Sequence, residues 1–210
     1  MVETTFVKIC GLSTPESVDQ AVHHGADAVG FVFAESVRKV TPELARDLVA
    51  RVPDSVETVG VFRAQPIDDV IAIARAAGVS TIQFHGREPL DDVRRAQQEG
   101  FRTLRAFGVD EFSALSGADR DEWADERLLV DAVEPGGGIP FDPRLLAHGA
   151  PMGWWLLAGG LTPENVRALI SRLQPTGVDV SSGVELQRGV KSLERIAEFI
   201  HAAKGAQPLP

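Results

Sequence analysis

Short apolar segments recur along the chain at near-regular intervals. They are rich in Val, Ile, Leu and Phe and are almost continuously apolar, which is typical of parallel strands buried on both faces. Eight such segments begin 21 to 29 residues apart, enough each time for one strand, one helix and two short loops. The pattern predicts strands at Phe6–Gly11, Ala28–Phe33, Glu57–Phe62, Thr81–Gly86, Arg102–Phe107, Arg127–Ala132, Trp154–Gly159 and Gly177–Ser182.

The stretches between these strands carry helix signals. Ser13 stands three residues before Glu16, as in a capping box with Ser13 as the N-cap. Thr41-Pro42 and Thr162-Pro163 each place a capping hydroxyl before a proline in the first helical turn. Three glycines stand where helices are expected to end: Gly25, Gly78 and Gly100.

Eight strand–helix units in about 200 residues predict a single-domain α/β fold, a (β/α)₈ TIM barrel. We expect the barrel over residues 1–204, followed by a short tail at 205–210. The alternative, a doubly wound open sheet, usually shows a glycine-rich fingerprint after its first strand, and Cys10-Gly11-Leu12-Ser13 is not one. Between Val109 and Glu126, Gly117 and scattered acidic residues predict a short or irregular fifth helix.

The amino-acid composition limits the classes of partner that we expect the chain to bind. The 210 residues carry a formal net charge of −9, which disfavours nucleic-acid binding. The single cysteine, Cys10, excludes an internal disulfide framework and a thiolate zinc cluster, and fits a reducing, cytoplasmic location. We expect no metal, cofactor or membrane partner and no signal peptide at Met1–Phe6, whereas monomer and homodimer both stay open.

In a (β/α)₈ barrel the active site lies at the C-terminal ends of the strands. Strand alternation sends Lys8 and Cys10 into the interior, where the lysine is expected to favour the thiolate and lower the pKa of Cys10. Asp131 ends an apolar segment as an isolated carboxylate. We expect Asp179, on the neighbouring last strand, to pair with Lys8 within about 6 Å, which leaves Cys10 and Asp131 for chemistry. The alternatives are a small buried hydrophobe at Cys10 and a structural salt bridge at Asp131.

Glycine-rich strand ends predict an anion site. Backbone N–H groups at the seventh and eighth strands can approach a phosphate there; the residues are Gly159, Gly160, Ser181, Ser182 and Gly183. Arg38, after the second strand, could hold a second anionic group, or could be a solvated surface arginine. We interpret His85 as an interior histidine that supports the site through hydrogen bonds, with a catalytic base as the alternative. Trp154-Trp155 is interpreted as packing at the lower rim, and Pro135–Gly138 as a flap or an ordinary turn.

These residues occur in blocks that resemble phosphoribosylanthranilate isomerases nearly end to end. The blocks are Val7–Gly11, Gly25–Phe33, Val59–Phe62, Gln83–Gly86, Leu129–Asp131, Leu157–Val166 and Val178–Glu185. The resemblance implies the rearrangement of N-(5-phosphoribosyl)anthranilate in tryptophan biosynthesis, with no cofactor. It also implies Cys10 as general base, Asp131 as general acid, the glycine-rich ends as the phosphate site and Arg38 as the partner of the anthranilate carboxylate.

The sequence differs from the family pattern at two places, and two other functions stay open as alternatives. Val37 and Lys39 flank Arg38 where the family has proline and usually an aromatic residue, and 136–142 is one residue shorter than the corresponding family segment and is followed by Pro143. A histidine-pathway isomerase performs the same rearrangement on a larger bisphosphate, but that family carries an aspartate on its first strand. A sugar-phosphate-binding barrel without catalysis is the alternative from another class.

Overall fold

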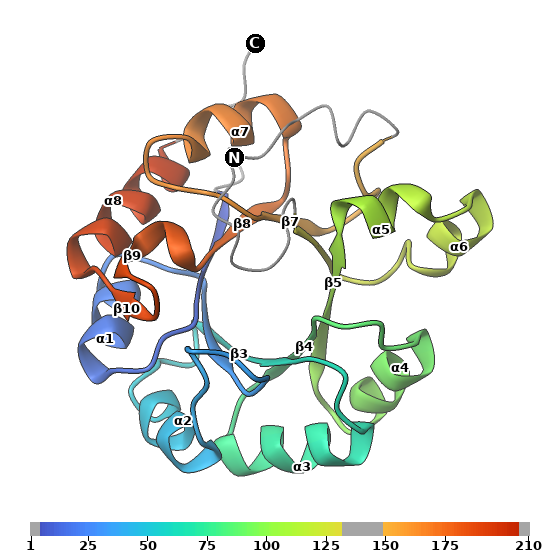
Figure 1. Ribbon diagram of the computed structural model, residues 1–210, viewed down its shortest axis with the longest axis horizontal. Coiled ribbons are helices and arrows are strands. Elements are labelled where there is room, and N and C mark those ends of the chain that lie inside the picture. The colour runs from blue at the N-terminus through green and yellow to red at the C-terminus, as the bar shows by residue number, and fades with distance from the viewer. Residues whose placement is uncertain (1–4, 132–148, 206–210) are drawn as a thin grey trace.

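Eight parallel strands form a closed barrel in the computed structural model, which describes residues 5–131 and 149–205 (Figure 1). The strands follow one another around the barrel in chain order, and β8 pairs with β1. This confirms the predicted TIM barrel. The strands are β1 (Phe6–Cys10), β2 (Ala28–Val32), β3 (Glu57–Phe62), β4 (Thr81–Phe84), β5 (Arg102–Gly108), β6 (Leu128–Asp131), β7 (Trp155–Ala158) and β8 (Gly177–Val180).

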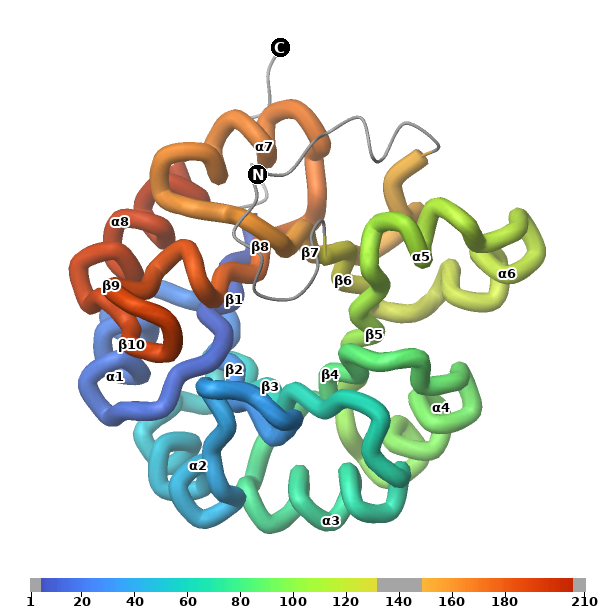
Figure 2. Tube along the Cα trace, in the orientation of Figure 1, coloured from blue at the N-terminus to red at the C-terminus, as the bar shows by residue number. Residues whose placement is uncertain are grey.

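The helices form a ring outside the barrel (Figures 1 and 2). They are α1 (Pro15–His23), α2 (Pro42–Val49), α3 (Ile67–Ala77), α4 (Leu90–Gln98), α5 (Val109–Ala114), α6 (Gly117–Glu122), α7 (Val166–Leu173) and α8 (Leu193–Lys204). The two short helices α5 and α6 both follow β5, which confirms the irregular fifth connection. The segment with the predicted flap, 135–138, the shortened stretch 136–142 and the tail residues 206–210 lie outside the described residues.

Two of the predicted helix starts are wrong. The N-cap of α1 is Thr14 rather than Ser13, because the Thr14 side chain accepts from the Ser17 N–H at 3.2 Å. The helix α7 begins at Val166 rather than at Thr162-Pro163, since Asn165 first closes a turn by accepting from the Thr162 N–H at 2.8 Å. Thr41 does cap α2, and Gly78 ends α3 in the left-handed region at φ +72°.

Strand alternation separates two layers of side chains. Val7 and Ile9 are fully buried in the main core between the strands and the helices. Lys8 and Cys10, on the opposite face of β1, point into the barrel. A smaller interior cluster is formed by Leu104, Ala106, Leu129, Leu156 and Ala158. The interior of the barrel therefore contains a cluster of apolar side chains, and polar groups lie toward the C-terminal ends of its strands.

The opposite end of the barrel is closed by ion pairs and aromatic packing. Glu57, the first residue of β3, accepts from Arg127 at 2.8 Å. The Arg127 guanidinium lies 3.9 Å from the ring centre of Trp154, and Phe6 packs edge-on against that ring. Trp155 is buried. The tryptophan pair thus has the packing role that the sequence predicted.

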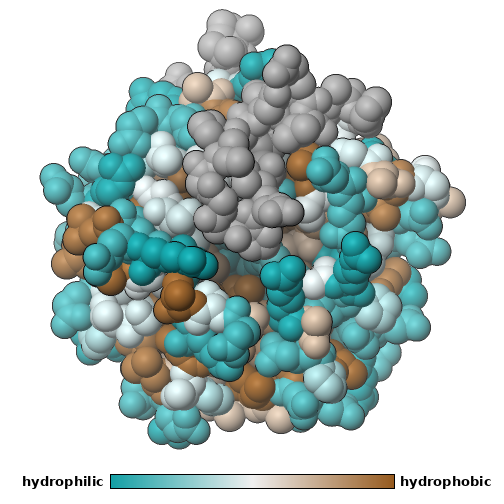
Figure 3. Space-filling model, viewed as in Figure 1, coloured by the Kyte–Doolittle hydropathy of each residue, from teal (hydrophilic) through white to brown (hydrophobic). Residues whose placement is uncertain are grey.

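A small hairpin not predicted from the sequence stands between β8 and α8. The chain leaves β8 at Val180, makes a single 3₁₀ turn, η2 (Ser182–Val184), and then pairs β9 (Glu185–Gln187) with β10 (Val190–Lys191). Gly189, at φ +87°, supplies the left-handed residue that the tight turn needs. Figure 3 shows the face of Figure 1, on which this hairpin lies, as largely hydrophilic with small hydrophobic groups. Within the described residues, no helix has the length and apolar character of a membrane span.

Candidate active site

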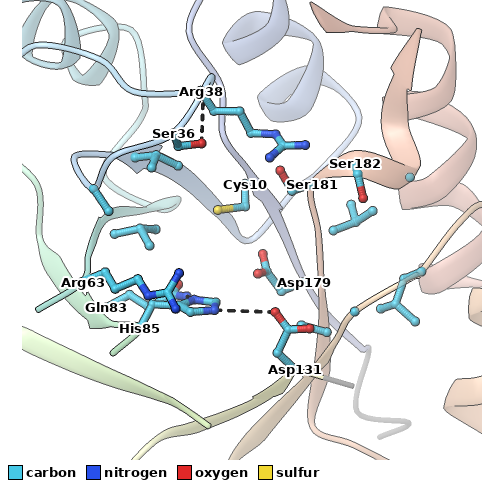
Figure 4. Close-up of a pocket in the computed structure, with 18 of the residues that line it drawn as sticks. Cys10, Ser36, Arg38, Arg63, Gln83, His85, Asp131, Asp179, Ser181 and Ser182 are labelled. Carbon is cyan, nitrogen blue, oxygen red and sulfur yellow. Dashed lines mark hydrogen bonds and ion pairs between the residues drawn. The ribbon is translucent and has the colours of Figure 1, made fainter. Parts of the chain in front are cut away.

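A cavity of about 270 Å³ opens at the C-terminal ends of the strands, as predicted for this fold (Figure 4). It brings together all the predicted site residues except Lys8, which is fully buried. These residues are Cys10, Arg38, His85, Asp131, Gly159, Gly160, Asp179, Ser181, Ser182 and Gly183. Residues from six different strand ends therefore share one pocket.

Cys10 ends β1 and lines this cavity with only 7% of its surface exposed. Its neighbour across the sheet is Gly30, and a Cβ there would lie 3.0 Å from the Cys10 Sγ, so the missing side chain leaves room for the thiol. The expected lowering of the Cys10 pKa is wrong. Burial raises the pKa of the thiol, and Asp179 adds to this, whereas Lys8 and Lys191 lower it by less.

Lys8 and Asp179 form the predicted interior ion pair. The two residues are register partners on adjacent strands, and Lys8 Nζ donates to Asp179 Oδ1 at 2.8 Å. Burial lowers the pKa of Lys8, but Asp179 and Cys10 together raise it above its ordinary value. The lysine therefore stays charged under the floor of the cavity.

Asp131 ends β6 on the other side of the cavity mouth, facing His85 (Figure 4). His85 Nε2 lies 3.6 Å from Asp131 Oδ2, and His85 Nδ1 lies 3.1 Å from Gln83 Nε2. The Gln83 amide contacts one ring nitrogen of His85, and the Asp131 carboxylate lies nearest the other. His85 thus connects the buried Gln83 to the carboxylate and itself lines the cavity.

The two glycine-rich strand ends pack directly against each other. Gly159 and Gly160 have φ of +90° and +64°, and a Cβ on Gly183 would lie 1.7 Å from the Leu161 carbonyl oxygen. Asn165 fixes the first loop by donating to the Gly160 carbonyl at 2.9 Å. The sequence reading missed this role of Asn165, although Asn165 lies in the same block as the glycines.

Arg38 is a partly buried, ion-paired residue and not a solvated surface arginine. Its Nε and Nη2 donate to the two carboxylate oxygens of Glu185 at 2.6 and 2.9 Å. A Cβ on Gly11 would lie 2.8 Å from Arg38 Cδ and 3.0 Å from Ser181 Oγ, so this glycine allows both side chains to meet over the end of β1. The sequence did not indicate Glu185 as the partner, nor that Arg63 and Arg188 also line the cavity.

The chain matches one family model over most of its length. Residues 7–202 match the model for N-(5'phosphoribosyl)anthranilate isomerase. The chain belongs to this family. The isomerases of Rubrobacter xylanophilus and Deinococcus radiodurans are each 41% identical to it over 202 residues, covering 94% of this chain and 98% and 96% of their own.

Solved isomerase structures share the fold at similar coverage. TrpF from Jonesia denitrificans is 42% identical, with a TM-score of 0.85 over 96% of this chain and 98% of its own. A phosphoribosylanthranilate isomerase in complex with reduced 1-(o-carboxyphenylamino)-1-deoxyribulose 5-phosphate is 34% identical, with a TM-score of 0.81 over 96% and 99%. Membership of the isomerase family thus rests on both sequence and structure.

Proposed function

We propose that the cavity carries out the family reaction, the Amadori rearrangement of N-(5-phosphoribosyl)anthranilate, with Cys10 as general base and Asp131 as general acid. The activity is that of a phosphoribosylanthranilate isomerase, an enzyme of tryptophan biosynthesis. The observation that carries the assignment of roles is the placement of a thiol and a carboxylate on facing strand ends, β1 and β6, of one pocket.

The reaction needs one proton donated and one removed. Asp131 donates a proton to the ribose ring oxygen, the C1′–O bond breaks, and the ring opens to a protonated Schiff base. The Cys10 thiolate then removes the C2′ proton and an enolamine forms. Tautomerisation gives 1-(2-carboxyphenylamino)-1-deoxyribulose 5-phosphate. Substrate and product are isomers, so the written steps consume no electron acceptor. General acid and base steps each contribute typically about 10²–10⁴-fold.

His85 acts as a positioning residue for the acid in this proposal. Its Nε2 lies 3.6 Å from Asp131 Oδ2, while Gln83 contacts the opposite ring nitrogen. This arrangement orients the carboxylate toward the cavity rather than taking its proton. It deepens the interior supporting role that the sequence predicted for His85.

The two anionic groups of the substrate need cations or N–H donors within a protein of net charge −9. We assign the phosphate to the loops at Gly159-Gly160 and Ser181–Gly183, where glycine backbones come close together, and the anthranilate carboxylate to Arg38. Arg63 and Arg188 also line the cavity. These local donors offset the global charge at the one place where the substrate binds.

The oligomeric state and the cellular location of the protein are the remaining parts of the proposal. An isomerase structure from Thermotoga maritima, 34% identical to this chain with a TM-score of 0.80, is of monomers generated from a dimeric enzyme. A phosphorylated substrate and a free thiol at Cys10 both fit a cytoplasmic enzyme. Gel filtration with light scattering decides between a monomer and a homodimer.

A fluorescence assay tests the proposed activity against both alternatives. Freshly formed phosphoribosylanthranilate is followed by its fluorescence decay with the purified protein, and the histidine-pathway substrate is supplied in parallel. We expect catalysed turnover of the first substrate. Decay at the uncatalysed rate with folded protein would contradict the assignment, and turnover of only the second substrate would favour the histidine-pathway isomerase.

A further inference from the structure

Glu185 lies at the centre of a buried network of ion pairs beside the cavity. Only 4% of its side chain is exposed, and it accepts from Arg38, from Lys191 Nζ at 3.0 Å and from the Gly189 N–H at 3.0 Å. Burial raises the pKa of Glu185, but Arg38, Gly189 and Lys191 lower it to about 2. The carboxylate is therefore ionised throughout the working range of pH.

One branch of the network fixes Arg38. Glu185 occupies the Nε and Nη2 edge of the guanidinium, and two parallel bonds set the plane of the group as well as its position. Nη1 has no hydrogen-bond partner in the part of the chain that the structure describes, and Arg38 lines the cavity. Figure 4 shows the guanidinium extending over Ser181, on the same side of the cavity as Cys10.

The other branch reaches the phosphate loop. Lys191 Nζ donates to the Ser181 carbonyl at 2.7 Å and to Ser181 Oγ at 3.1 Å, so all three ammonium donors are used within the hairpin and the β8 loop. Two cations share one carboxylate, which leaves one net positive charge in the network. Of the two cations only Arg38 lines the cavity, and burial lowers the pKa of Lys191 below its ordinary value.

From these contacts we infer that Glu185 is a positioning residue of the isomerase reaction: it presents the free edge of Arg38 to the substrate carboxylate and, through Lys191, ties that arginine to the Ser181 loop. This inference rests on the proposed function. Glu185 and Lys191 do not line the cavity themselves, so they act through Arg38 and Ser181 and not by contact with substrate. The ligand class is a molecule that carries both a carboxylate and a phosphate.

Two ligands separate this role from simple structural support. The reduced form of the product carries both anionic groups, and ribose 5-phosphate carries only the phosphate. In the Glu185→Gln variant we expect calorimetry to show affinity for the reduced product falling at least about tenfold, while affinity for ribose 5-phosphate changes less than about threefold, because a misplaced Arg38 loses a charge-assisted bond to the carboxylate. KM should rise by a similar factor with kcat nearly unchanged.

A matched control and a second variant keep the outcome interpretable. Asp19 forms a comparable two-bond pair with Arg51 outside the cavity, so Asp19→Asn should leave both affinities unchanged. Glu185→Asp keeps the charge but is too short to hold both cations, and should show the same selective loss if Glu185→Gln fails to fold.

Equal weakening of both ligands, or of neither, by folded Glu185 variants would overturn the inference. Its failure differs from a failure of the proposed function. Wild-type protein that does not isomerise phosphoribosylanthranilate refutes the function, whereas an active wild type with Glu185 variants that bind the reduced product normally refutes only the positioning role.

Discussion

Breaking the ion pair between Lys8 and Asp179 should destabilise the barrel strongly. Lys8 is fully buried and Asp179 is 8% exposed, and their charged atoms are 2.8 Å apart. At an effective dielectric constant of about 20 their attraction is about 6 kcal/mol, which offsets the cost of burying both charges. Lys8→Met leaves the carboxylate buried without this partner, so the free energy of unfolding should fall by about 3–5 kcal/mol.

Urea unfolding followed by tryptophan fluorescence and by circular dichroism measures this effect. With a slope of about 3 kcal/mol per molar urea, the midpoint should fall by about 1–1.7 M. The double variant Lys8→Met/Asp179→Leu should recover most of the loss, because no charge is then left buried alone. The exposed pair of Lys39 and Glu35 supplies the control, and Lys39→Met should change the free energy of unfolding by less than about 0.5 kcal/mol.

The sign of the pH dependence follows from the raised pKa of Lys8. The stability that the pair contributes is fully present below the unfolded lysine pKa of about 10.4 and is lost as pH rises through the higher folded value. A loss below about 1 kcal/mol in Lys8→Met, or a double variant as unstable as the sum of its single variants, would refute this reasoning.

Three other predictions concern the loops, the base of the barrel and the thiol. Gly183→Ala should weaken binding of ribose 5-phosphate at least about tenfold by calorimetry, because the new Cβ would overlap the Leu161 carbonyl and separate the two loops. Arg127→Met should lower the free energy of unfolding by about 2 kcal/mol in urea and leave kcat/KM unchanged, since Glu57 lies at the opposite end of the barrel from the cavity. Burial raises the pKa of Glu57, but Arg127 and Thr81 lower it below its ordinary value, so this contribution is present above the unfolded pKa of about 4.3 and is lost as pH falls through the folded value. A pH–rate profile should show kcat/KM rising toward high pH, because the pKa of the Cys10 thiol is raised and the thiolate is the base; a profile that is flat above neutral pH would contradict this.

Much of the fold could be predicted because strand identity and order depend on local pattern. The apolar segments and their spacing indicate the eight strands, and alternation within β1 places Lys8 and Cys10 inside the barrel. Most predicted strands are one or two residues too long at an end, because the end of the hydrogen-bonded ladder depends on the neighbouring strands and is not marked by the residue types there. The N-cap of α1 is Thr14 and not the predicted Ser13, because two adjacent hydroxyl residues are about equally able to cap a helix.

Long-range polar contacts could not be predicted in the same way. Arg38 and Glu185 are 147 residues apart, and they meet only because a hairpin follows β8 and turns back over the end of β1. The pKa direction of Cys10 was wrong because a neighbouring lysine is visible in the sequence, whereas the depth of burial that outweighs it is a property of the closed barrel. The pair of Lys8 and Asp179 was predictable, since both positions follow from strand order and register.

The measurement that tests the acid–base assignment most directly is kcat/KM for phosphoribosylanthranilate in the Cys10→Ala and Asp131→Ala variants. Each value should be at least about a hundredfold below that of the wild-type protein, because each variant lacks one proton-transfer group. Both variants should retain the wild-type circular dichroism spectrum and a cooperative unfolding transition. A folded variant whose kcat/KM stays within about twofold of the wild-type value, well inside the loss expected for a missing acid or base, would contradict the role of the residue it replaces.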